Sequence, residues 1–170
     1  MNQKHRPRRL ILLAVATLLP LVGGAALAQT LTMAMSAQPD TLDPQVTAAT
    51  AAFQVSKSIY DTLIEVDRQG NLVPALAASY SVSADGLTYT FELADATFHD
   101  GTAFDSGDVV ASLDRIRAEE TASPKLSEFR AIVAVEAQGP STVTITLAEP
   151  QPALLASLAS GCWTWPTAAR

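Results

Sequence analysis

The chain of 170 residues contains one cysteine, Cys162, and two histidines. One cysteine cannot form an intramolecular disulfide, and one thiol with a distant histidine gives too few ligands for a zinc site. The glycine patterns of nucleotide-binding loops and the G-x-S-x-G motif of serine hydrolases are also missing. The sequence therefore predicts no cofactor, no metal and no catalytic centre.

Acidic residues are absent from the first 28 residues, whereas residues 29–170 contain 7 basic and 17 acidic side chains, a net charge of -10. Such an excess of negative charge repels phosphate backbones, so nucleic-acid binding is excluded. Apolar residues make up 48% of the chain and charged residues 16%, which is typical of a globular protein.

Residues 1–28 have the layout of a cleaved signal peptide. A basic stretch precedes an uncharged run over residues 10–28, whose strongly apolar part ends at Pro20. The small residues of Ala26-Leu27-Ala28 then predict cleavage between Ala28 and Gln29. No lipoprotein box stands at the end of this segment, so a mature chain outside the cytoplasm is expected. The uncharged run is long enough to span a membrane, and an uncleaved anchor is the alternative.

Short segments of alternating and helical hydrophobicity follow, which predicts an α+β fold with antiparallel hairpins. Expected strands cover residues 31–35, 63–66, 80–82, 87–93, 132–136 and 142–147. Expected helices cover residues 50–63, a segment that begins after the N-cap Asp105, and residues 153–159. In the strand over residues 87–93, Tyr89 and Phe91 should be buried while Thr88, Thr90 and Glu92 face outward.

The residues around His99 form a tight turn rather than a catalytic dyad. His99 and Asp100 are adjacent, so their side chains cannot take the mutual orientation of a Ser-His-Asp triad. Asp100, Asp105 and Asp108 lack the spacing of a calcium-binding EF-hand loop, and helix capping explains Asp105 and Asp108.

An ordered series of short motifs is more specific than any of these features. It comprises Thr41–Pro44 (TLDP), Ile59–Leu63 (IYDTL), Gly70–Ala77 (GNLVPALA), Asp85–Phe91 (DGLTYTF), Phe98–Thr102 (FHDGT) and Asp108–Val110 (DVV). In this order, the motifs resemble the N-terminal part of the family 5 extracellular solute-binding proteins, the peptide/nickel class of ABC importers. The resemblance extends from about Leu31 to Ala159.

The resemblance implies part of a two-lobed periplasmic binding protein-like (type II) fold, a monomer that captures a peptide or small-molecule solute and delivers it to ABC permease subunits in the inner membrane. Residues 29–71 would begin the cleft-bearing lobe, and residues 72–160 would form an incomplete α+β subdomain. The ligand-binding positions implied are Ala37, Gln38, Pro39, Asp40, Ala49 and Thr50. These positions are equally well explained as ordinary turn residues.

The family's proteins are several times longer, and residues 161–170 do not continue the resemblance. A truncated and impaired binding protein is therefore expected, in which one lobe alone holds a solute weakly. Two other functions are left open by the residues. One is a small secreted hydrolase, against which the missing nucleophile motif counts, and the other is a membrane-anchored interaction domain.

Overall fold

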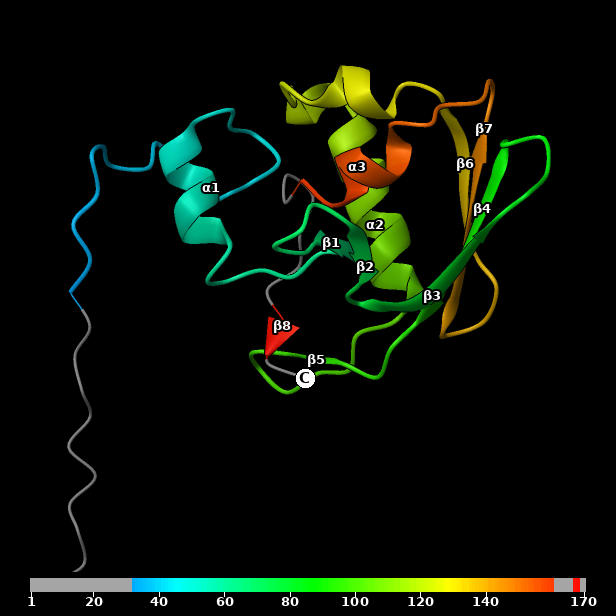
Figure 1. The fold of residues 1–170 in the computed structure, drawn as a ribbon, viewed down its shortest axis with the longest axis horizontal. Coiled ribbons are helices and arrows are strands. Elements are labelled where there is room, and N and C mark those ends of the chain that lie inside the picture. The colour runs from blue at the N-terminus through cyan, green and yellow to red at the C-terminus, as the bar shows by residue number, and fades with distance from the viewer. Residues whose placement is uncertain (1–31, 161–166, 169–170) are drawn as a thin grey trace, which may run out of the picture. The chain divides into compact units, whose positions relative to one another are not determined.

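The structure, a computed structural model, describes residues 32–160 and 167–168, and those from Ala34 onward belong to one compact unit (Figure 1). Its α-helices are α1 (Thr50–Ser56), α2 (Ser106–Arg117) and α3 (Leu154–Leu158), and two short 3-10 helices are η1 (Glu119–Thr121) and η2 (Leu126–Phe129). The strands are β1 (Ile64–Val66), β2 (Leu72–Pro74), β3 (Ala77–Val82), β4 (Thr88–Leu93), β5 (Thr97–Phe98), β6 (Ile132–Ala137), β7 (Thr142–Leu147) and β8 (Thr167–Ala168).

A four-stranded antiparallel sheet of order β3-β4-β7-β6 organises this unit. The hairpin of β3 and β4 turns at Ser83–Gly86, where the Asp85 carboxylate accepts the N–H of Leu87 at 3.0 Å and Gly86 adopts a φ of +71°. That backbone conformation favours glycine because a side chain would meet the following carbonyl. The predicted hairpins 80–82/87–93 and 132–136/142–147 are both confirmed.

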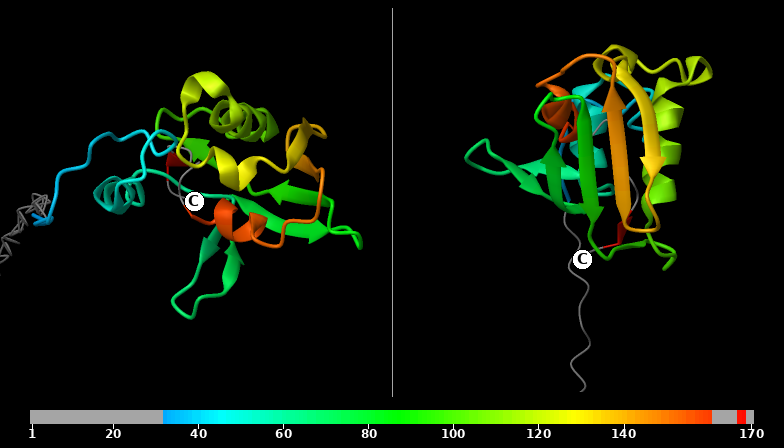
Figure 2. Two further views of the ribbon diagram at one scale, coloured as in Figure 1. Left: turned by 90° about the horizontal axis from the view of Figure 1, so that it is seen from above. Right: turned by 90° about the vertical axis from the view of Figure 1, so that its right-hand side faces the viewer.

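The core lies between one face of this sheet and α2 (Figure 2). Tyr89 and Phe91 are buried, whereas Thr88 and Thr90 are half-buried and Glu92 is exposed, as the alternation predicts. The neighbouring strand β7 repeats the pattern, and α2 contributes one apolar stripe to the same core. The side chains that these two elements bury are Val143, Ile145, Leu147, Val109, Leu113 and Ile116.

Helix α2 begins where its sequence predicts. The Asp105 carboxylate accepts the N–H groups of Gly107 and Asp108, while the Asp108 carboxylate accepts the N–H of Asp105 at 2.9 Å. This capping box satisfies backbone donors that the first helical turn leaves free, and such caps contribute about 1 kcal/mol. Ser106 also donates its N–H to the carbonyl of Pro140, which fixes the start of α2 beside the turn between β6 and β7.

Two expectations about the N-terminal part are wrong. Residues 32–35 belong to no strand, and Met33 is 74% exposed. Among the described residues no strand pairs with this stretch, and a single strand without a hydrogen-bonding neighbour is unstable.

The expected helix over residues 50–63 ends early, at Ser56. Ser58 and Ile59 donate their N–H groups three residues back, which tightens and terminates the last turn. Leu63 instead accepts the N–H groups of Ala75 and Ala77 through its carbonyl, which joins it to the strands. Its apolar side chain is buried in the core. The helical spacing of apolar residues therefore predicted the burial of Leu63 correctly but not the length of the helix.

Candidate ligand-binding site

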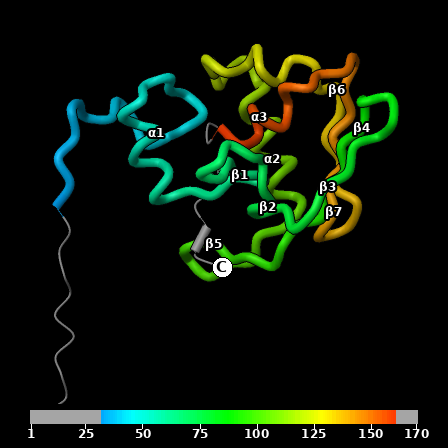
Figure 3. Tube along the Cα trace, viewed as in Figure 1, coloured from blue at the N-terminus to red at the C-terminus, as the bar shows by residue number. Residues whose placement is uncertain are grey.

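The predicted ligand-binding residues lie on the stretch that leads into α1 (Figure 3). Ala37, Gln38 and Asp40 are exposed, and Pro39 is half-buried. Ala49 is the N-cap residue of α1, and Thr50 is the first, exposed residue of that helix. We name residues 40–50 the entry loop.

Thr47 connects the two ends of the entry loop. Its hydroxyl donates to the Asp40 carboxylate at 2.9 and 3.0 Å and accepts the N–H of Ala49 at 3.0 Å. Thr47 is only 2% exposed, so its hydroxyl is shielded from water although the Asp40 carboxylate is exposed. The structure therefore brings Asp40 and Ala49 together. Among the described hydrogen bonds, none that involves a side chain links the stretch 37–39 to this network.

The middle of the entry loop is bonded to α2. Arg115 donates from Nη1 to Asp43 Oδ1 at 3.2 Å and from Nη2 to Asp43 Oδ2 at 2.5 Å, a two-pronged ion pair. Nη1 also donates to Gln45 Oε1 at 2.6 Å, and Gln45 Nε2 donates to Ser112 Oγ at 2.8 Å. Sequence reasoning missed Gln45, Ser112 and Arg115, since no local pattern indicates which polar side chains meet across such a separation.

The ion pair shifts the pKa values of both partners. The pKa of Asp43 lies below its ordinary value of 3.8, mainly because the Arg115 guanidinium donates to its carboxylate. Partial burial opposes this shift, while the N–H of Gln45 and the charge of Arg115 add to it. The pKa of Arg115 is raised, chiefly by the same hydrogen bond.

The lowered pKa predicts an acid-sensitive contribution to stability. Because the folded pKa of Asp43 is below 3.8, its stabilisation is complete above the unfolded value of 3.8 and is lost as the pH falls through the folded pKa. Asp43→Asn should therefore lower the thermal midpoint at neutral pH and lose this difference from the unsubstituted chain under acid conditions. Thermal unfolding of both proteins across the acid range measures it, and a pH-independent difference would contradict the assignment.

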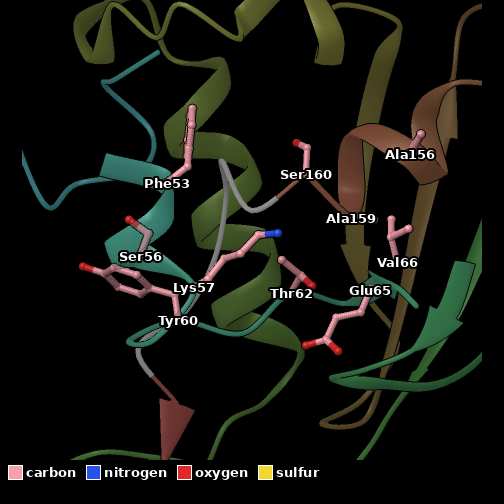
Figure 4. Close-up of a pocket in the computed structure, with 10 residues that line it drawn as sticks. All are labelled: Phe53, Ser56, Lys57, Tyr60, Thr62, Glu65, Val66, Ala156, Ala159 and Ser160. Carbon is pink, nitrogen blue, oxygen red and sulfur yellow. The ribbon is translucent and has the colours of Figure 1, made fainter. Parts of the chain in front are cut away.

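A pocket of about 550 Å³ lies between α1, β1 and α3. Phe53, Lys57 and Tyr60 line one side and Glu65 and Val66 another, so a cation, a carboxylate and apolar surface surround one space. In Figure 4 the Lys57 ammonium points toward the side of Thr62 and Ser160.

The sequence analysis did not predict this pocket, although part of its lining comes from one face of the expected helix over residues 50–63. Phe53, Ser56 and Tyr60 share one face of the expected helix, and all three line the pocket, whereas none of the six predicted ligand-binding residues does. The Ser56 hydroxyl is buried and lacks a hydrogen-bond partner among the described residues. Figure 4 shows this hydroxyl directed away from the Lys57 ammonium, so Ser56 does not present a hydrogen-bonding group to the pocket centre.

His99 lies exposed in the turn after β5. The neighbouring Asp100 carboxylate accepts hydrogen bonds from the N–H and the hydroxyl of Thr102 at 2.9 and 2.7 Å, which stabilises the turn rather than orienting the imidazole.

In the described part of the chain, no three His, Cys, Asp or Glu side chains cluster as metal ligands would. No helix within residues 32–160 is long and apolar enough to cross a membrane. The predicted signal peptide, residues 1–28, and its cleavage site before Gln29 lie outside the described residues, as does Cys162.

Residues 71–166 match the model of the bacterial extracellular solute-binding proteins, family 5 Middle. The glutathione-binding protein GsiB of Escherichia coli is 37% identical over 151 residues, which cover 88% of this chain. The chain spans about 29% of the length of that relative.

Two solved structures are also similar. The binding protein AgaA of A. tumefaciens, in complex with agropinic acid, is 36% identical with a TM-score of 0.72, over 76% of this chain and 26% of AgaA. NikZ of Campylobacter jejuni, in complex with Ni(L-His), is 30% identical with a TM-score of 0.67, over 74% of this chain and 25% of NikZ. The described fold is therefore that of one portion of a two-lobed periplasmic binding protein.

Proposed function

Because the chain belongs to the bacterial extracellular solute-binding proteins of family 5, we propose that it supplies part of the solute-binding component of an ABC importer. The observation that carries the proposal is the family match over residues 71–166, together with the AgaA-like fold at 36% identity. The relatives are binding proteins, and no catalytic role is proposed for this chain.

The solute we propose is a peptide or a related small polar molecule. GsiB is named for glutathione, AgaA was solved with agropinic acid and NikZ with Ni(L-His). Ala37, Gln38, Pro39 and Asp40, with Ala49 and Thr50, would present polar and backbone groups to such a solute. Their surface position supports this role, as does the Thr47 bridge between Asp40 and Ala49.

The proposal extends to export and partners. Residues 1–28 would direct export and be removed before Gln29, and the mature protein would act as a periplasmic monomer that docks on permease subunits in the inner membrane. Residues 29–71 would belong to the cleft-bearing lobe and residues 72–160 to the α+β subdomain. The intact mass of exported protein tests the processing step, since retention of Met1 would exclude cleavage.

A hybrid protein tests the solute-binding role. Residues 34–160 replace the matching segment of the E. coli relative GsiB, and calorimetry measures binding of glutathione, a tripeptide pool and nickel. The hybrid should bind at least one of these solutes at micromolar concentration. This chain titrated alone should bind on the order of 100-fold more weakly, because one face supplies few contacts while most of the entropic cost of immobilising the solute remains.

A second hybrid that carries only residues 37–50 provides the control for folding. If the larger hybrid does not fold, the smaller one still tests the proposed contact residues, because the rest of that hybrid is unchanged GsiB. A folded hybrid that binds none of the solutes, while GsiB binds glutathione, would refute the proposed function. Micromolar binding by this chain alone would instead refute the requirement for a second lobe.

A further inference from the structure

The entry loop is attached to α2 by polar side chains that come from distant parts of the chain. Asp43 and Gln45 on the loop meet Ser112 and Arg115 on the helix, and up to 72 residues separate the bonded partners. We infer that Arg115 and Gln45 are positioning residues, which hold the entry loop on α2 in the conformation that binds solute. This inference rests on the proposed function and names residues that the proposed contact set omits.

Gln45 is the centre of the attachment. It is 4% exposed, yet its amide is bonded at both ends. Its Oε1 accepts from Arg115 at 2.6 Å, and its Nε2 donates to the hydroxyl and carbonyl oxygens of Ser112 at 2.8 and 3.2 Å. A buried amide without partners is costly, so this side chain strongly favours the one loop position in which both ends are bonded.

A continuous series of hydrogen bonds leads from Arg115 to the proposed ligand contacts. Asp43 accepts from Arg115, and its own N–H donates to Thr41 Oγ1 at 3.1 Å. The N–H of Thr41 donates to the Asp40 carboxylate at 3.0 Å, and Asp40 in turn accepts from Thr47. The bonds on α2 are thereby connected to Asp40, and through Thr47 to Ala49.

Apolar burial contributes less to holding the loop. Leu42 is 49% exposed and Val46 is 40% exposed, while Pro44 is buried. Because two of its apolar side chains are only about half buried, the loop depends mainly on its polar bonds for a defined position. The guanidinium of Arg115 supplies two parallel bonds to Asp43, a geometry that a lysine ammonium cannot reproduce.

The inference is tested with Arg115→Lys. This substitution keeps the positive charge but removes the planar guanidinium that makes two parallel bonds to Asp43. Arg117→Lys is the matched control, because Arg117 is on the same helix and donates to Asp114 and to the carbonyl of Ile132, not to the entry loop. Ser112→Ala is a second test variant that removes one bond to Gln45 without changing any charge. Amide hydrogen exchange is measured in the full chain. Solute affinity is measured in the larger GsiB hybrid, which carries residues 34–160 and therefore contains all three substituted positions.

In Arg115→Lys, the amides of Asp43, Gln45 and Ala49 should exchange about tenfold faster while those of β4 and β7 stay unchanged. The dissociation constant of the hybrid should rise by about the same factor, and Ser112→Ala should move both quantities in the same direction. Arg117→Lys should leave loop exchange and affinity within about twofold of their original values.

Three results would overturn the inference. Unchanged loop exchange in Arg115→Lys would show that the attachment does not hold the loop. Faster loop exchange with unchanged affinity would show that loop position does not matter for the solute. Absence of solute binding by the unsubstituted hybrid would refute the proposed function, and the positioning role with it. The exchange data in the full chain separate this last case from a failure of the attachment itself.

Discussion

Phe91→Ala is expected to lower the free energy of unfolding by about 3–5 kcal/mol, the range for a large aromatic side chain removed from a packed core. Phe91 is fully buried at the centre of β4. It lies opposite Tyr80 on β3 and Val143 on β7, and the centroids of the Tyr80 and Phe91 rings are 6.0 Å apart. The substitution removes contacts with both neighbouring strands, and the sheet cannot collapse around the resulting cavity without disturbing its register.

Urea-induced unfolding monitored by circular dichroism measures this loss. Thr90→Ala is the matched control, since Thr90 immediately precedes Phe91 on the same strand and points to the other, half-buried face. That control should change the free energy of unfolding by at most about 1 kcal/mol, the span of strand propensities, because Thr90 is not part of the core. A loss below about 1 kcal/mol for Phe91→Ala would contradict the assignment of this face to the core.

Leu113→Asp is expected to have a still larger effect and to leave the chain unfolded at neutral pH. Leu113 is fully buried where α2 packs on the sheet. The substitution removes about 2–5 kcal/mol of packing and adds the cost of a buried, unpaired carboxylate, several kcal/mol more. Together these terms approach the 5–15 kcal/mol that stabilises a typical domain.

Circular dichroism and amide exchange compare this variant with Ala111→Asp. Ala111 is exposed on the same helix, so its substitution introduces the same charge at the surface rather than in the core. The loss of helix propensity is similar in the two variants. Ala111→Asp should keep the β4 and β7 amides protected. Retained protection of these amides in Leu113→Asp would mean that α2 does not cover the sheet as described.

The elements with local sequence signals were predictable. Strand β4 alternates large apolar and small polar residues, and Asp85-Gly86 provides the turn before it, so the hairpin and its buried face follow from adjacent residues. The start of α2 follows similarly, because Asp105 and Asp108 suit the free N–H groups of a first helical turn. In each case the residues that determine the structure are neighbours in the chain.

The remaining features depend on contacts between distant residues. Met33 and Met35 have the period of a strand, but no described strand pairs with them, and hydropathy contains no information about a missing neighbour. The helical spacing of apolar residues extends to Leu63, but the helix ends at Ser56. Leu63 is buried because its backbone joins the strands, not because it lies on the helix. Of the candidate site, the family resemblance implied six ligand-binding positions, which stay predictions, whereas the bonds of Gln45 to Ser112 and Arg115 join residues about 70 positions apart and have no local sequence signal.

The central pairing of the sheet determines the order in which this unit can fold. Strands β3 and β4 are joined by a short turn, as are β6 and β7, so each hairpin can form within microseconds. The pairing of β4 with β7 instead joins residues about 50 positions apart, such as Glu92 and Thr142, and must close a long loop that contains α2. The first hairpin therefore leaves one edge of β4 unpaired until β7 pairs with it. A chaperone that binds exposed strand edges would act in that interval.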